Sequence, residues 1–427
     1  MRADVVVVGA GAAGSVVARR ASEAGLDVLL LEAGASRASG RAGLLDVGPD
    51  SAVVARHPAE LAGAPVELPR GFTLGGSGAV NGGYCAPATP GDLGAWGPDW
   101  PRRYAVGLAR AAERLRPRIV PTDPVAARLS AAFPGRGASI AQARRGDLRV
   151  TATDAWDPAG AGARVLTGAA VRELRWAGGR AGGRCDGVVL ADGREVEARE
   201  VVLCAGTIGT AALLLASGVG PGTGHPVGAR TEEHPEVLLE LEPDAATGAE
   251  PAARPAPPPG ADGPALPPLL SHVVRLAVGG REVEVRPYAA PMHHLIPGLT
   301  PQPHRIGVAL MDPAGRGEIT AAPAGGVRVV LDAHPDASDA AALAAAAALV
   351  AERMGITGAA VPSTSQHLSG SARMGEVVDD SGRVLGAEGL RVADASVLPR
   401  LPRRGPYYSV LAVAEDLSAR IVAGRAW

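Results

Sequence analysis

The chain has 427 residues, 47% of them hydrophobic, and a formal net charge of −2. This length allows two or three structural domains, and the balanced charge excludes the basic footprint of a nucleic-acid-binding protein. Three scattered cysteines are too few for a disulfide framework, and no apolar run reaches the roughly 20 residues of a membrane-spanning helix. We therefore expect a cytoplasmic protein, with peripheral contact to a membrane as the open alternative.

The first 34 residues carry the strongest local pattern. An apolar run over residues 5–8 predicts a strand, and GAGAAG at 9–14 predicts a tight turn that opens a helix. A second apolar run at 28–31 ends at Glu32. The glycines let the backbone approach a pyrophosphate at the helix N-terminus, and the acid can bind ribose hydroxyls. The pattern predicts dinucleotide binding but does not separate FAD from NAD.

A second glycine-rich segment, GFTLGGSGAVNGGY at 71–84, follows. Its glycines around Ser77 and Asn81 indicate a backbone pressed against a flat or charged group. Here the sequence resembles the glucose–methanol–choline (GMC) oxidoreductase family, whose first signature lines the flavin ring and pyrophosphate. The resemblance implies that the cofactor is FAD.

Further segments resemble this family in its own order. Residues 206–220 resemble its second signature, with Ala211 in place of the usual proline, and 228–235 and 389–396 resemble two later segments. The resemblance spans nearly the whole chain and implies an α/β fold, with a Rossmann-like FAD-binding domain and a discontinuous substrate domain built on an antiparallel sheet. The residues implied to contact FAD are Gly9, Gly11, Ala12, Ala13, Gly14, Glu32, Gly75, Ser77, Asn81, Gly82, Val171, Ala205, Gly206, Asp394 and Ala395.

The expected domains interleave along the chain. The FAD-binding domain is expected to comprise residues 1–100, 147–235 and 360–427, and the substrate or cap domain residues 101–146 and 236–359. Apolar runs separated by Gly and Pro predict the strands of an antiparallel sheet. These runs lie at 237–241, 272–278, 282–288, 306–311, 318–320 and 327–331.

Three other segments of the expected substrate domain stand out. An alanine-rich stretch at 340–351 predicts a helix, preceded by Asp336 and closed by Gly355. Residues 243–268 are rich in Pro, Ala and Gly and predict a loop or lid. The chain is short for the family between residues 84 and 171, which implies reduced helical cover over the site.

His367 is the expected catalytic base. It lies in QHLSGSARMG at 366–375 and matches the catalytic histidine of the family, and an imidazole titrates near neutral pH. The family places a second His or Asn near the start of the C-terminal helix, and counting back from 409–415 puts Tyr407 there. A phenol can donate a hydrogen bond to an alkoxide but is a poor base at pH 7. Aromatic packing of Tyr407 against the flavin, or a role for Tyr408, remains open.

The other histidines give weaker expectations. His234 is expected to be architectural, orienting a loop over the flavin pocket. His293 and His294 are adjacent, and on a strand they would point to opposite faces, so we expect no metal site there.

A finer resemblance concerns the electron donor. Residues 77–84, 285–288, 306–311 and 363–367 are similar to the GMC dehydrogenases associated with mycofactocin. The implied reaction is transfer of a hydride from an alcohol carbon to flavin N5, with reduced mycofactocin or a small-molecule alcohol as donor and a respiratory carrier or oxygen as acceptor. The alternatives are another GMC alcohol dehydrogenase or oxidase, an FAD-containing lyase, a non-catalytic flavoprotein and an NAD-dependent Rossmann enzyme.

Overall fold

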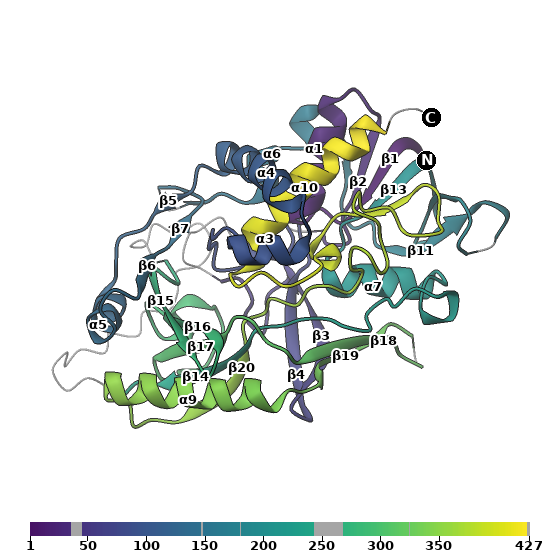
Figure 1. Cartoon of the computed structure of the whole chain (residues 1–427). Coiled ribbons are helices and arrows are strands. Elements are labelled where there is room, and N and C mark those ends of the chain that lie inside the picture. Colours follow the sequence, from purple (N-terminus) through teal and green to yellow (C-terminus); the bar gives the residue numbers. More distant parts are fainter. Residues whose placement is uncertain (36–44, 147, 180, 243–267, 324, 425–427) are drawn as a thin grey trace.

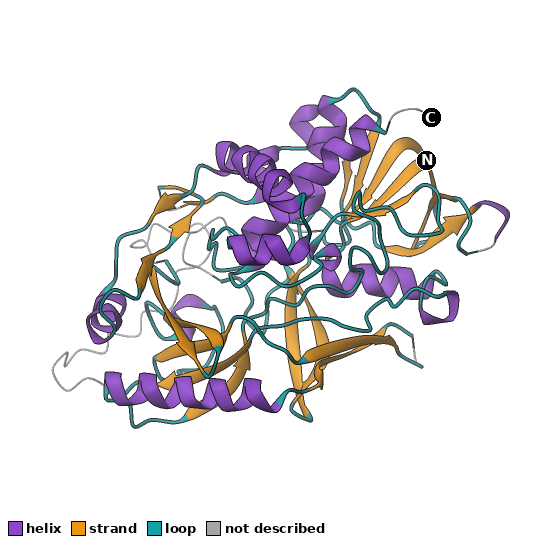
Figure 2. Ribbon diagram, in the orientation of Figure 1, coloured by secondary structure: helices purple, strands orange, loops and turns teal. Residues whose placement is uncertain are grey.

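The structure, a computed structural model, describes residues 1–35, 45–146, 148–179, 181–242, 268–323 and 325–424. Two large sheets lie in different parts of the molecule, each covered by helices (Figures 1 and 2). A third, smaller sheet lies between them. No helix among the described residues is long and apolar enough to cross a lipid bilayer.

A seven-stranded sheet forms the dinucleotide-binding part. Its central strands are parallel and almost fully buried, as expected for unbroken apolar runs covered on both faces. The predicted strands at 5–8 and 28–31 are confirmed as its β1 and β2. The path of the sheet is β10 (Arg164–Leu166), β2 (Val28–Leu31), β1 (Arg2–Val8), β13 (Glu195–Leu203), β12 (Cys185–Leu190) and β11 (Val171–Trp176), and β21 (Leu390–Val392) also pairs with β13.

Three helices pack together beside this sheet: α1 (Ala12–Glu23), α4 (Trp100–Leu115) and α10 (Pro406–Ala423) (Figure 1). Helix α4 lies within the range expected for the substrate domain, yet its Ala111 and Leu115 are buried in the same core as α10. Helix α4 thus packs with the FAD-binding side, and the expected domain bounds stay a prediction.

A six-stranded antiparallel sheet forms the substrate side, as predicted. Helices α5 (Pro124–Ala132) and α9 (Ala337–Met354) pack against it in a separate hydrophobic core. The predicted helix is confirmed: the side chain of Asp336 caps its N-terminus, and Gly355 ends it with a φ of 65°. The strands run in the order β20 (Ala360–Thr364), β14 (Pro235–Glu240), β17 (Arg305–Leu310), β16 (Arg281–Pro287), β15 (His272–Val278) and β6 (Gly137–Ser139).

Two predicted strands belong to a different sheet. The runs at 318–320 and 327–331 form β18 (Arg316–Ala321) and β19 (Val327–His334), which join the hairpin of β3 (Val54–Leu61) and β4 (Ala64–Gly71). The buried residues of β18 and β19 pack into the larger core with the dinucleotide-binding sheet. Their expected place in the substrate sheet was therefore wrong, because alternation predicts a strand without identifying its partner.

Other predictions have mixed outcomes. His293 and His294 lie on a short helix, α8 (Met292–Leu295), and not on a strand, so the strand geometry used to argue against a metal site does not apply to them. Most of the predicted loop at 243–268 lies outside the described residues. The segment from 84 to 171 does contain helices, although the shortened cover expected there stays a prediction. The remaining elements are α2 (Ser77–Val80), α3 (Pro90–Trp96), α6 (Ala152–Trp156), α7 (Gly206–Ala216), β5 (Arg118–Ile119), β7 (Ala141–Gln142), β8 (Arg144–Arg145) and β9 (Leu148–Arg149).

Candidate active site

The loop between β1 and α1 has the geometry of a phosphate cradle. Gly9 has a φ of +99°, and a Cβ there would lie 2.5 Å from the carbonyl oxygen of Cys204. A Cβ at Gly14 would lie 1.9 Å from the carbonyl oxygen of Gly9. Gly11 is the N-cap of α1, no side chain caps the helix, and its first turn holds no acid. The amide end of α1, which begins at Ala12 and Ala13, thus suits an anionic pyrophosphate.

Glu32 is fixed at the end of β2. Its Oε2 accepts a hydrogen bond from the Ala10 amide at 2.9 Å, and its Oε1 accepts one from the Gly34 amide at 2.9 Å. Burial raises the pKa of this carboxyl, and the backbone hydrogen bonds oppose that shift. The orientation brings the carboxylate to the phosphate loop, where a ribose would lie.

The second glycine segment packs directly on the first. The Gly75 amide donates to the Ala10 carbonyl at 2.8 Å, and a Cβ at Gly76 would lie 2.7 Å from the Cα of Gly11. Side chains within the segment hold its own turns: Ser77 Oγ accepts from the Gly71 amide at 3.0 Å. The two glycine segments, 65 residues apart at Gly11 and Gly76, therefore form one surface.

The far end of this segment is held by the substrate side. Asn81 Oδ1 accepts from the Gly83 amide at 2.9 Å, and the Gly82 carbonyl accepts from Gln142 Nε2 at 3.0 Å. A Cβ at Gly82 would lie 2.9 Å from a methyl group of Leu269. Gly82 thus lies against Gln142 of β7 (Ala141–Gln142) and Leu269, the latter in the segment before β15.

Asp394 ties two chain segments together. Its Oδ2 accepts from the Gly206 amide and from Thr210 Oγ1, each at 2.7 Å, and its Oδ1 accepts from the Ser396 amide at 2.8 Å. These bonds fix the orientation of the carboxylate, and the expected contact of Asp394 with the cofactor stays a prediction. Ala205 is the N-cap of α7, and Ala395 begins the turn that follows Asp394. Val171, another residue expected to contact FAD, is the first residue of β11 in the seven-stranded sheet.

Two histidines far apart in sequence meet in the structure. The Nδ1 atoms of His234 and His367 lie 2.9 Å apart, and their rings are nearly perpendicular at 87°. The peptide amides of both residues donate to one oxygen of Glu233, at 2.8 and 2.7 Å. Gln366, directly before His367, has a φ of +64°, a strained conformation for a residue other than glycine. The base candidate is thus held by its backbone and by a second imidazole.

The electrostatic environment keeps both imidazoles neutral. Burial, the guanidinium of Arg286, His234 and Arg70 together hold the pKa of His367 well below its usual range. Burial and Arg286 act in the same direction on the pKa of His234. A neutral imidazole has one nitrogen lone pair available, so His367 can accept a proton at neutral pH.

The position across from His367 Nε2 is a glycine. A Cβ at Gly405 would lie 3.5 Å from His367 Nε2 and 3.2 Å from the ring of Tyr84. The Tyr84 hydroxyl donates to Glu284 Oε2 at 2.8 Å, so this ring is held against Gly405. No side chain from position 405 can therefore face the imidazole, and Tyr84 lies there instead.

Tyr407 packs on the second glycine segment. The Cβ position of Gly78 is 2.8 Å from Tyr407 Cε2, which places this ring on the second glycine segment. Burial raises the pKa of its phenol. No hydrogen bond joins Tyr407 to His367 among the residues that the structure describes. The structure thus brings His367 together with His234 and Glu233, which the sequence did not single out as partners, and leaves Tyr407 beside the expected flavin surface.

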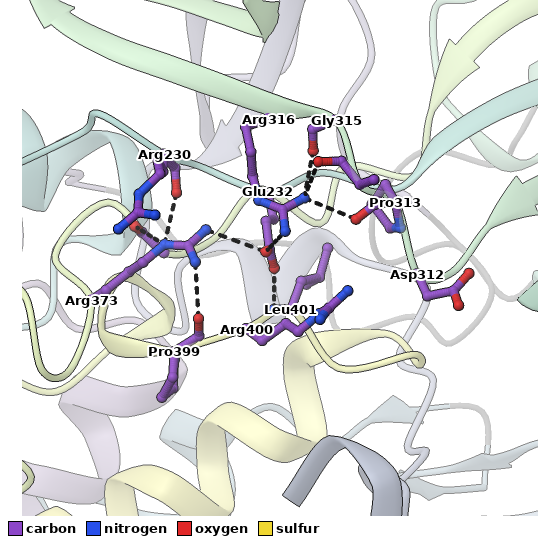
Figure 3. Close-up of polar contacts among 12 residues, drawn as sticks. Arg230, Glu232, Asp312, Pro313, Gly315, Arg316, Arg373, Pro399, Arg400 and Leu401 are labelled. Carbon is purple, nitrogen blue, oxygen red and sulfur yellow. Dashed lines mark hydrogen bonds and ion pairs between the residues drawn. The ribbon is translucent and has the colours of Figure 1, made fainter. Parts of the chain in front are cut away.

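A buried ion-pair cluster anchors the segment that carries Glu233 and His234 (Figure 3). Glu232 Oε1 lies 3.0 Å from Arg316 Nη2 and 3.3 Å from Arg373 Nη2, and its Oε2 accepts from the Leu401 amide. Arg373 also donates to the carbonyls of Arg230 and Pro399. The cluster joins the His234 segment, β18, the loop after His367 and the loop before α10.

This fold combines a Rossmann-type dinucleotide cradle with a pair of neutral histidines. Residues 7–62 match an NAD(P)-binding Rossmann-like domain, and residues 108–236 and 313–414 match the two parts of the GMC oxidoreductase family. The chain is 34% identical to an uncharacterized GMC-type oxidoreductase from the thcA 5′ region of Rhodococcus erythropolis, over 98% of each chain. The chain therefore belongs to the GMC oxidoreductase family, and its cofactor is FAD.

Solved structures share the fold. Pyridoxine 4-oxidase from Mesorbium loti superposes with a TM-score of 0.77 at 22% identity, covering 98% of both chains. A fungal aryl-alcohol oxidase superposes with a TM-score of 0.77 at 17% identity, covering 99% of both chains. At these identities the likeness establishes the fold and leaves the substrate of this chain open.

Proposed function

We propose that this chain oxidises an alcohol, with His367 as the base that takes the hydroxyl proton at Nε2. FAD, when bound in the cradle, supplies the acceptor for the hydride that leaves the alcohol carbon. The products are then a carbonyl compound, a protonated His367 and a two-electron-reduced cofactor, which a respiratory carrier or oxygen must reoxidise. The observation that carries the proposal is the neutral imidazole of His367, whose Nδ1 is engaged by His234.

The proton-accepting nitrogen lies on the side of Gly405. A Cβ at that glycine would lie 3.5 Å from His367 Nε2 and 3.2 Å from the Tyr84 ring. The hydroxyl of Tyr84 is occupied by Glu284, so Tyr84 contributes its ring to this side of the site. His367 thus performs proton transfer, while Glu233 and His234 hold it in place.

The decisive experiment mixes the FAD-loaded protein with alcohols under anaerobic conditions and follows the flavin absorbance. The wild type should be bleached by its donor, and His367→Ala should keep its FAD but lose roughly 10²- to 10⁴-fold in the rate of reduction. His225→Ala is a matched control, because the His225 ring contacts the Leu385 carbonyl, in a different segment. If His367→Ala reduced its flavin at the wild-type rate, His367 would not be the catalytic base.

We further propose reduced mycofactocin as the donor. Contacts join three of the four segments that resemble the mycofactocin-associated enzymes, one of which contains His367: Arg286 of β16 donates to Ser365 at 2.7 Å, and Arg286 Nη2 contacts Met311 Sδ at 3.4 Å after β17. Bleaching by reduced mycofactocin and not by small alcohols supports this donor. If only small alcohols reduce the flavin, the result supports the alternative function, an alcohol dehydrogenase or oxidase that acts on a small molecule.

Two other functions have distinct outcomes in the same experiment. An FAD-containing lyase would cleave a cyanohydrin without bleaching the flavin. A non-catalytic flavoprotein would stay oxidised with every donor, an outcome motivated by the glycine that faces His367. Protein in the cytoplasmic fraction, rather than in the washed membrane fraction, would support the proposed cytoplasmic location.

A further inference from the structure

The contact between His234 and His367 constrains where their protons lie. A hydrogen bond between two Nδ1 atoms 2.9 Å apart needs one proton between them, donated by one ring to the lone pair of the other. Two protonated Nδ1 atoms would repel, and two bare ones would leave the contact unpaired. The pair of neutral rings therefore has two arrangements, which differ in which histidine is the donor.

Only one arrangement leaves His367 competent as a base. If His367 donates from Nδ1, its Nε2 carries the lone pair on the side of Gly405. If His234 donates instead, His367 carries its proton on Nε2 and cannot accept another proton there. The first arrangement also survives the reaction, because His367 with protons on both nitrogens still donates to His234 from Nδ1.

The proposed role of His367 requires the first arrangement. Burial and Arg286 lower the pKa of His234, so this ring is neutral and its Nδ1 can accept the proton that His367 donates. In the first arrangement the single proton of His234 lies on Nε2, the nitrogen directed away from His367. His234 is fully buried, and its amide and that of His367 donate to the same oxygen of Glu233, which fixes the two backbones relative to each other.

We propose that His234 is a positioning residue that holds His367 in the tautomer with its proton on Nδ1, leaving Nε2 ready for the donor hydroxyl. The inference rests on the proposed function of His367 as the base. It assigns His234 a role beyond the architectural one predicted from sequence, since its ring selects the protonation state of another ring.

Two substitutions separate this role from packing. His234→Asn places Oδ1 where Nδ1 was and keeps an acceptor for His367, whereas His234→Leu fills similar space without one. We expect His234→Leu to keep its FAD and KM but to lose about 100-fold in the rate of flavin reduction, equivalent to about 2.7 kcal/mol of activation free energy. His234→Asn should recover most of that rate, and His225→Leu should leave it unchanged.

The tautomer itself can be read without turnover. In ¹⁵N-histidine-labelled protein, two-bond ¹H–¹⁵N spectra distinguish a protonated Nδ1 from a protonated Nε2, and His367→Ala identifies the signal. The wild type and His234→Asn should show His367 protonated on Nδ1, and His234→Leu should shift it towards Nε2. His367 protonated on Nε2 in the wild type, or equal rates in the Leu and Asn variants, overturns the inference. If the tautomer is as expected but no alcohol reduces the flavin, the proposed function fails while the inference about His234 stands.

Discussion

Replacing Glu232 by glutamine tests the buried cluster of Figure 3. The Glu232 side chain is 3% exposed and those of Arg373 and Arg316 are 10% and 22% exposed, so the change leaves two largely buried guanidinium groups without their shared anion. Removing one partner of a buried ion pair costs about 3–5 kcal/mol. We expect the lower end, about 3 kcal/mol, because both arginines keep backbone carbonyl partners.

The expected shift in melting temperature follows from chain length. With an unfolding entropy of about 2.1 cal/mol/K per residue, 427 residues give about 0.9 kcal/mol/K for unfolding as one unit, so the melting temperature should fall by about 3 °C. Release of FAD on heating, followed by flavin fluorescence, measures this directly.

An exposed ion pair provides the control. Arg230, with 58% of its side chain exposed, pairs with Glu376, and such pairs contribute about 0–1 kcal/mol. Glu376→Gln should therefore melt within about 1 °C of the wild type. Equal melting temperatures for Glu232→Gln and Glu376→Gln would refute the assignment of a stabilising role to the buried cluster.

Two further predictions concern pH and the tyrosine beside the flavin. Because burial and Arg286 lower the pKa of His367, the rate of flavin reduction should rise with pH along a limb centred below about 6.5, and a midpoint above neutrality would contradict the neutral base. The same lowered pKa makes the unfolded state bind more protons below about pH 6.5, so the melting temperature should fall as the pH is lowered through that value. Tyr407→Phe removes the hydroxyl and keeps the ring against Gly78, so its rate of flavin reduction should stay near that of the wild type; a large loss would restore Tyr407 as a catalytic candidate.

The dinucleotide cradle could be predicted because its requirements are local. Gly9 and Gly14 are needed where a Cβ would strike the backbone of a neighbouring strand or turn, and both glycines fall in one short pattern with the strand and helix that flank them. The same pattern predicted the position of Glu32 at the end of the second strand. The strand, helix and second strand of this pattern are confirmed, and the contacts of these residues with FAD stay a prediction.

The arrangement around His367 could not be predicted in the same way. His234 is 133 residues away, and its contact depends on how β14 and β20 pair in the second sheet. The signal available was the run Glu232-Glu233-His234, three polar residues before a strand, all of which the structure buries. The count back from residues 409–415 gave Tyr407 as the residue with a polar side chain. The position that lies against the imidazole is Gly405, which has no side chain.

Helix α10 and the loop before it contribute to both the core and the site. It packs on α1 and α4, and its Leu411 and Leu417 are fully buried in the larger core. The loop before it supplies Leu401 to the Glu232 cluster and Gly405 to the side of His367. The core beneath β1, β2 and the phosphate loop is therefore completed by a segment far away in the sequence, and the same segment supplies Gly405 to the side of His367. Deletion of residues 401–423 is expected to impair the cofactor cradle and the surroundings of His367 together.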